Sequence, residues 1–178
     1  KGKMKGKITE CEFNGDERSG IIAFLNHFYG GDAVGSVKLA LRDGIQSDQK
    51  KFKAILNPES CYRHNANSRD KDWIEFDFGR LKVNLSSYSI CVCSENSGPK
   101  SWLISGSNDR SCWTVLSKMK NREETKGHCV QKKFDCNKNS GFYQFIRFTL
   151  LDTWYNVPQK KYKLHLKYID FFGSMIDQ

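Results

Sequence analysis

Two short segments of the chain combine the side chains that binding sites use to hold sugars, phosphates or carboxylates. The first consists of Tyr62, Arg63, His64 and Asn65, inside the long polar stretch 57–72. A tyrosine ring is an amphipathic platform, and an arginine offers a planar fork of donors to a carboxylate or phosphate. We therefore predict that this segment binds a ligand, the alternative being an ordinary solvated loop.

The second segment consists of Trp154, Tyr155 and Asn156, between the last two strands that the sequence predicts. Adjacent exposed aromatic rings reduce solubility unless they contact another molecule. This segment is therefore also predicted to contact a ligand. The alternative is that Trp154 folds back and plugs the end of the core.

A run of basic residues lies in the last third of the chain. Residues 116–178 carry 12 basic and 6 acidic side chains, and so hold most of the formal net charge of +9. Such a surface suits acidic partners, and a row of lysines can follow a phosphate backbone. No aromatic residues are interleaved, so stacking of single-stranded nucleic acid is not indicated, and a solvated loop is the alternative. The predicted basic patch consists of Lys118, Lys120, Arg122, Lys132 and Lys133, with Lys126 between them.

The residue patterns of common catalytic and metal sites are missing from the sequence. It contains no GxSxG, HExxH or P-loop pattern, and its 4 histidines are scattered. His128, Cys129 and Cys136 could supply three metal ligands, but their spacing matches no zinc site. We therefore predict that the chain is not an enzyme and has neither a metal nor a cofactor.

The elements that must position these residues are mostly strands. Ile74, Phe76 and Phe78 fall on one face of an alternating segment, whereas Glu75 and Asp77 fall on the other. This alternation predicts a half-buried strand with a wet outer face. Further strands are predicted over residues 37–41, 83–85, 88–93, 102–104, 113–116, 144–151, which looks central, and 164–171, which carries a bulge near Lys167 and Tyr168.

A single helix is predicted over residues 21–29, where apolar residues recur at helical spacing before Gly30 and Gly31. Many short strands, one early helix and no alternation of strands with helices predict an all-β, antiparallel sandwich or jelly roll. At 178 residues one domain is expected, spanning 20–178 after a basic N-terminal arm at 1–19. Its predicted core includes Ile74, Phe76, Phe78, Ile90, Trp102, Ile104, Ile146, Phe148 and Phe171.

Several of these pieces, in this order, resemble a known family. They are the loop after Pro58, residues 73–78, Ser89-Ile90, residues 101–109, Trp113, residues 145–148 and residues 168–173. The sequence resembles the discoidin or coagulation-factor type C domain, a galactose-binding-like jelly roll. Residues Ile21-Ile22 with Gly30-Gly31 resemble the lead-in of intracellular members, including those joined to BTB domains and those common in protists. The resemblance implies a rigid barrel whose loops at one end hold a sugar, a phospholipid head group, collagen or a protein segment.

The cysteines point to a reducing compartment. Secreted members of the family usually close their ends with a disulfide; Cys11 could be one half of it, but no cysteine lies near Phe172. The chain has 7 cysteines, an odd number, so free thiols and a cytoplasmic location are expected. No apolar run approaches the roughly 18 residues that span a bilayer.

Three functions are compatible with these features. The first is a non-enzymatic binding module that docks an acidic or polar protein partner, such as a cytoskeletal surface, through loops at one end of the barrel. The alternative is a carbohydrate-binding module that uses Tyr62, Asn65, Trp154 and Tyr155. The third is binding of anionic lipid or, less favoured, nucleic acid through residues 118–133.

Overall fold

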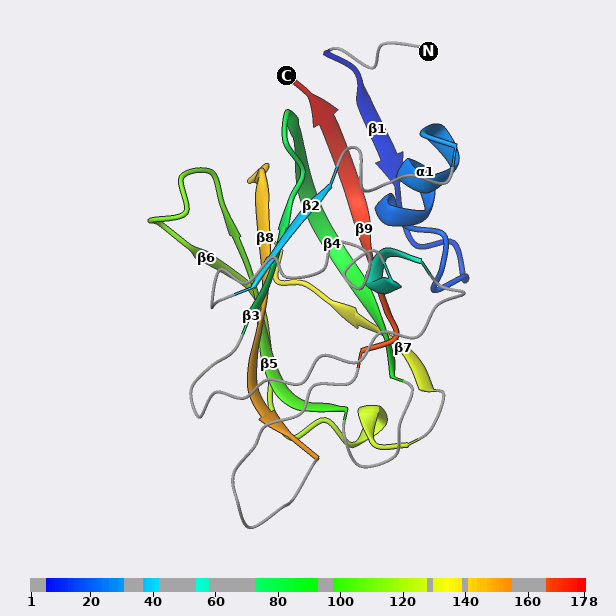
Figure 1. Cartoon of the computed structure of the whole chain (residues 1–178), viewed down its shortest axis with the longest axis vertical. Coiled ribbons are helices and arrows are strands. Elements are labelled where there is room, and N and C mark those ends of the chain that lie inside the picture. The colour runs from blue at the N-terminus through cyan, green and yellow to red at the C-terminus, as the bar shows by residue number, and fades with distance from the viewer. Residues whose placement is uncertain are drawn as a thin grey trace.

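The chain folds as two antiparallel β-sheets packed face to face (Figure 1). The computed structural model describes residues 6–30, 37–41, 54–57, 73–92, 98–127, 130–138, 141–154 and 166–178. One sheet has the strand order β1-β9-β4-β7, and the other has the order β2-β3-β8-β5-β6. The strands are β1 (Ile8–Cys11), β2 (Lys38–Leu41), β3 (Trp73–Asp77), β4 (Leu81–Val92), β5 (Pro99–Ser107), β6 (Thr114–Met119), β7 (Val130–Asp135), β8 (Phe145–Thr153) and β9 (Tyr168–Asp177). The predicted all-β antiparallel sandwich is confirmed.

The core lies between the inner faces of the two sheets. All nine residues predicted for it are buried, none more than 1% exposed. The predicted central strand is confirmed as well, because β8 lies between β3 and β5 in the middle of the five-stranded sheet. One buried polar cluster is satisfied within the core: Trp102 Nε1 donates to the Tyr88 hydroxyl over 2.8 Å, and that hydroxyl lies 3.0 Å from Ser117 Oγ. The alternation of apolar residues along the predicted strands was enough to identify the nine buried core residues.

Three features of the strands differ from the sequence-based expectation. Residues 83–85 and 88–93 were expected as separate strands, but residues 81–92 form the single strand β4. Its register against β9 jumps from Leu85 to Ser87, so an extra residue shifts the apolar alternation. The bulge expected near Lys167 and Tyr168 is wrong, because β9 begins at Tyr168 and its pairing with β4 shifts register only between Leu85 and Ser87 of β4. Strand β7 was missed, because only Phe134 of its six residues is buried.

Gly173 allows β9 to pass this bulge. Its φ of +140° belongs to a region that other residues rarely adopt, and an added Cβ would overlap the carbonyl oxygen of Asn84. Leu85 lies opposite Gly173 on β4, directly before the register jump. The close approach of the two strands at this point therefore requires glycine.

Helix α1 (Ile21–Phe28) confirms the predicted helix, and it lies beside β1 and β9 (Figure 1). Its first turn is capped by Asp170 of β9, far away in sequence. The Asp170 carboxylate accepts hydrogen bonds from the backbone N–H groups of Gly20 at 2.9 Å, Ile22 at 2.7 Å and Ala23 at 3.3 Å. It also accepts from the Tyr168 hydroxyl at 2.8 Å and from the backbone N–H of Phe171 at 2.8 Å. This carboxylate ties the helix to the sheet.

The titration of Asp170 is expected to make stability depend on pH. Burial raises its pKa from 3.8 to about 6, against the opposing effect of the hydrogen bonds from Tyr168 and the backbone. The folded chain therefore holds a proton that the unfolded chain releases, and this contribution to stability is fully present below about pH 4 and lost as pH rises through about 6. The difference in unfolding free energy between the wild type and Asp170→Asn should shrink by on the order of 2 kcal/mol between pH 4 and 7. Urea denaturation of both proteins across that range measures the difference, and a constant value would contradict the prediction.

Within the predicted N-terminal arm, Ile8–Cys11 forms the edge strand β1 and pairs with β9. The boundary between arm and domain stays a prediction. Cys11, Cys91, Cys112 and Cys136 carry free thiols, and Cys61, Cys93 and Cys129 lie outside the described residues. In the described part of the chain, no helix has the length and apolar character needed to cross a membrane.

Candidate functional site

The two ends of the sandwich differ in what they carry. Strand β1 begins and β9 ends at the upper end in Figure 1. At the opposite end β5 begins, β8 ends and the short 3-10 helix η3 (Glu123–Thr125) lies close by (Figure 1). Trp154 directly follows β8 and so belongs to this lower end.

Trp154 is held in place by hydrogen bonds from both its backbone and its side chain. Its backbone N–H donates to the Gly98 carbonyl over 3.1 Å. Its indole Nε1 lies 3.3 Å from both the Arg122 carbonyl oxygen and Thr125 Oγ1. Thr125 is itself buried and donates to the Pro99 carbonyl. The indole is half-buried, so its ring has a fixed orientation while part of it faces solvent.

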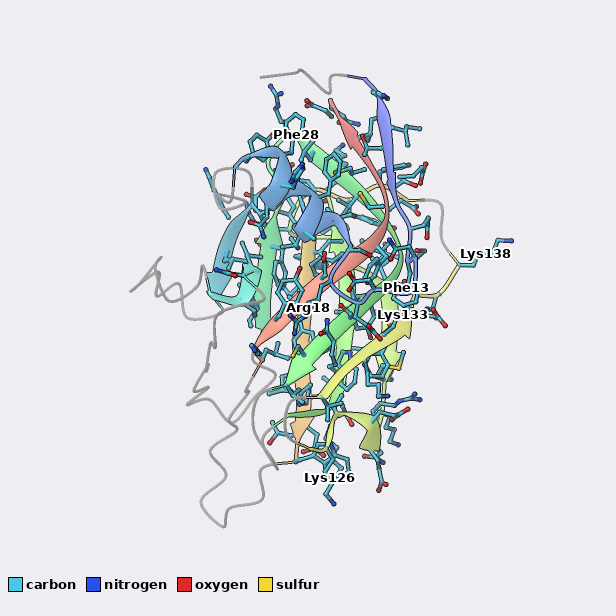
Figure 2. The ribbon with its side chains drawn as sticks, turned by 90° about the vertical axis from the view of Figure 1, so that its right-hand side faces the viewer. Phe13, Arg18, Phe28, Lys126, Lys133 and Lys138 are labelled. Atoms are coloured by element: carbon cyan, nitrogen blue, oxygen red, sulfur yellow. The ribbon has the colours of Figure 1, made fainter. Side chains whose placement is uncertain are left out.

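Two lysines accompany this ring. The Nζ atoms of Lys100 and Lys126 each lie 5.1 Å from the ring centroid, within the range of a cation–π interaction. Lys100 Nζ also lies 3.3 Å from an Asp152 carboxylate oxygen. Among the described residues Lys126 has no carboxylate partner, and Figure 2 shows it at the lower end of the described part of the chain. We call Trp154, Lys100 and Lys126 the Trp154 cluster; it combines an aromatic surface with two ammonium donors.

Trp154 and Lys126 were each singled out from the sequence, but separately, and nothing in the sequence indicated Lys100. Lys100 reaches Trp154 because β5 pairs with β8, with Pro99 opposite Thr153 and Ser101 opposite Asp152. No local pattern in the sequence indicates that β5 pairs with β8. Lys126 belonged to the predicted basic run, and the turn around η3 brings it to the indole.

The other predicted ligand-binding residues cannot be placed around this cluster. Tyr62, Arg63, His64, Asn65, Tyr155 and Asn156 lie outside the described residues. The Trp154 indole N–H points into the protein while the residue stays partly exposed, and its contact with a ligand stays a prediction.

The predicted basic patch is spread over two sheets. Lys118 lies on β6, at an edge of the five-stranded sheet, and Lys120 and Arg122 follow it before η3. Lys132 and Lys133 lie on β7, at an edge of the four-stranded sheet. Figure 2 shows Lys133 beside Phe13 and well away from Lys126. That these residues bind one ligand stays a prediction.

The outer face of the five-stranded sheet carries a cluster that the sequence did not indicate. Glu75 was expected on a wet face, but its side chain is only 3% exposed. Arg110 and Arg147 cover it, at 2.8 and 2.9 Å from its two carboxylate oxygens. The Arg147 guanidinium lies 3.9 Å from the ring centroids of both Trp73 and Trp113.

This cluster fixes the turn between β5 and β6 onto the sheet. Arg110 adopts a left-handed φ of +60°, and its guanidinium lies 3.9 Å from the Phe145 ring centroid. In the same turn, hydrogen bonds from the backbone N–H groups of Cys112 and Ser111 lower the pKa of Asp109. Both arginines of the cluster are paired with the buried Glu75 carboxylate, so we interpret the cluster as structural. Within the described ranges, no three His, Cys, Asp or Glu side chains gather as metal ligands.

Comparison with known proteins shows a likeness in fold. No protein-family model and no curated protein matches the chain. Among solved structures, the module CpGH89CBM32-5 from Clostridium perfringens, in complex with GalNAc-β-1,3-galactose, has a TM-score of 0.55 at 11% identity and covers 78% of this chain and 96% of its own. The family 32 carbohydrate-binding module of NanJ from C. perfringens, in complex with galactose, also has a TM-score of 0.55 at 11% identity, covering 78% and 94%. CBM62 from Clostridium thermocellum Xyl5A has a TM-score of 0.54 at 15% identity, covering 79% and 94%.

The chain has the galactose-binding-like fold. At these identities the likeness concerns the galactose-binding-like architecture and does not transfer a ligand. The broad resemblance read from the sequence is thus confirmed at the level of the fold. Membership of the discoidin or coagulation-factor type C family, and the narrower likeness to protist and BTB-associated members, stay predictions.

Proposed function

We propose that this galactose-binding-like chain is a non-catalytic carbohydrate-binding module whose site is built on the Trp154 cluster. The observation that carries the proposal is the anchored, half-exposed indole of Trp154 at the loop end of the sandwich. The fold supports the proposal, since the similar solved structures named above are carbohydrate-binding modules.

The chemistry of the cluster suits a sugar. One face of a sugar ring presents C–H groups that pack on an indole, while its hydroxyls need fixed polar partners. The Trp154 N–H is already bonded inside the protein, so what the indole can offer a ligand is the part of its ring surface that Lys100 and Lys126 leave uncovered. The ammonium groups of Lys100 and Lys126 supply donors next to that surface. The three side chains of the cluster together supply the apolar surface and the polar partners that a sugar needs.

Docking of an acidic protein partner, which the sequence favoured, has less support. It rests on the net charge of +9 and on loops that lie largely outside the described residues. The similar structures named above are all carbohydrate-binding modules. The carbohydrate-binding alternative therefore becomes our main proposal, and the cytoplasmic location stays a prediction.

The proposal predicts that Trp154→Ala weakens binding to the preferred glycan about tenfold or more, which equals about 1.4 kcal/mol. A glycan array, with and without calcium, identifies the ligand, and calorimetry measures its affinity for both proteins. Trp113→Ala is a matched control, because that tryptophan belongs to the cluster on the outer sheet face. Its affinity should stay within about twofold of the wild type if the variant remains folded by circular dichroism.

Two results would contradict this proposal. One is an array on which the wild type binds no glycan in either condition. The other is a folded Trp154→Ala variant with unchanged affinity. If pull-down then recovered an acidic protein whose binding survives moderate salt, the docking interpretation would replace it.

A further inference from the structure

The two lysines of the Trp154 cluster lie near the same ring, which limits how far apart their charges can be. Each Nζ atom is 5.1 Å from the Trp154 centroid, so the two ammonium groups are separated by at most twice that distance. At such a separation two positive charges repel each other weakly in water, and a negative group near both would be attracted to each. The indole attracts each of them through its ring electrons but carries no net charge.

None of the described carboxylates at this end forms an ion pair with Lys126. Asp152 pairs with Lys100, and Glu124 pairs with Arg122. Glu123 is exposed at the start of η3 and forms no ion pair with a described residue. Lys126 likewise has no described carboxylate partner. The ammonium group of Lys126 is therefore available to a negative group of a ligand.

The Lys100 side chain is also held more firmly than an ordinary surface lysine. It is 31% exposed, so most of its stem is covered, and its Nζ contacts both Asp152 and the indole. A partly desolvated, pre-positioned ammonium loses less rotamer entropy on binding and forms stronger bonds to an anion. Its hydrogen bonds to a carboxylate or sulfate are about twice as strong as those between neutral groups. A neutral sugar hydroxyl would form weaker hydrogen bonds with this ammonium group.

From these contacts we infer that the cluster selects an anionic sugar, with the carboxylate or sulfate of the ligand between Lys100 and Lys126 and its sugar ring beside Trp154. This inference rests on the proposed carbohydrate-binding function and names the class of ligand. A bare phosphate or an anionic lipid surface would use the two lysines but not the adjacent apolar ring. The combination of ring and charges therefore favours an acidic glycan.

The test uses matched pairs of glycans that differ only in charge. An array carries neutral glycans beside their uronate, sialylated and sulfated counterparts, and calorimetry compares digalacturonate with galactobiose and galactose 6-sulfate with galactose. We expect at least one acidic member to bind about tenfold more tightly than its neutral partner, which is about 1.4 kcal/mol. Comparison of the uronate and sulfate arms identifies which anion the site prefers. Affinity for the acidic member should fall as salt rises above about 0.1 M, while affinity for the neutral one should not.

Variants of the two lysines test whether these residues cause the preference for an acidic glycan. Lys126→Gln and Lys100→Gln should each reduce the ratio of acidic to neutral affinity about threefold or more, since each removes one ammonium group. Lys138→Gln removes an exposed lysine that Figure 2 shows away from Lys126, and it should leave the ratio unchanged.

The outcomes separate the two proposals. Equal binding of neutral and acidic glycans, unaffected by Lys126→Gln, would overturn the inference and leave the carbohydrate-binding function standing. Absence of binding to every glycan would overturn the function itself. If vesicles containing phosphatidylserine were then bound, with loss of binding in Lys126→Gln, the cluster would be a lipid site and both proposals would fall.

Discussion

Replacing Asp170 with alanine is expected to lower the free energy of unfolding by about 3–5 kcal/mol. Each buried donor left without an acceptor costs about 1–3 kcal/mol, and removing the cost of burying the carboxylate offsets part of that loss. The carboxylate is fully buried and accepts from four backbone N–H groups and one phenol. Alanine leaves all five donors without this acceptor. It also removes the connection between α1 and β9, so the helix loses its cap as well as its anchor. No other single polar side chain described here joins two elements through so many bonds.

Urea denaturation at neutral pH measures this loss, with Asp135→Ala as the control. The Asp135 side chain is 79% exposed and pairs only with Lys133 at the surface, so its removal should change stability by less than about 1 kcal/mol. Asp170→Asn should fall between the two, because it keeps an acceptor oxygen but places an amide donor among donors. A loss below about 1 kcal/mol for Asp170→Ala would show that the cap is dispensable.

Replacing Phe148 with alanine is expected to lower the free energy of unfolding by a similar amount, about 3–5 kcal/mol. Phe148 has no exposed surface and lies on the central strand β8, opposite Ile74 of β3 and Ile104 of β5. Its ring stacks against that of Trp102, with centroids 6.2 Å apart. Truncation removes buried apolar surface and leaves a cavity that neighbours on both sides cannot fill without breaking the strand pairing.

The same substitution at an exposed position provides the control. Phe28 at the end of α1 is 38% exposed; its ring stacks on Phe24 and meets the Tyr29 ring edge to face. Phe28→Ala should therefore lower the free energy of unfolding by about 1 kcal/mol, and Phe148→Leu by an intermediate amount. Equal losses at Phe148 and Phe28 in denaturant titrations would contradict the core position of β8.

The core and the fold class could be predicted because their signals are local. Alternation with a period of two residues places every second side chain of a strand on one face, and Ile74, Phe76 and Phe78 follow it directly. The helical spacing of residues 21–28 is equally local. Strand β7 was not predicted, because an edge strand buries few of its side chains. Residues 81–92 were predicted as two strands, because one extra residue reverses the alternation of apolar and polar side chains.

The candidate site was predictable only in part. An aromatic pair in a polar segment drew attention to Trp154, since exposed rings are unusual and need a reason. Lys100 has no such signal, because it lies 54 positions earlier and meets the indole only when β5 pairs with β8. No local signal in the sequence indicated that Glu75 is buried, since the two arginines that cover it come from other elements.

The sequence by itself determined the antiparallel sandwich, the single early helix and the apolar core, because these depend on the period of hydrophobic residues along each segment. Only the tertiary structure decided which polar groups meet. Asp170 caps a helix that begins about 150 residues earlier in the chain, and Lys126 joins Lys100 at the ring of Trp154. Such contacts depend on strand order and register, which cannot be read from the pattern of residue types along the chain. The chemistry of the site is therefore apparent only when the sheets are assembled.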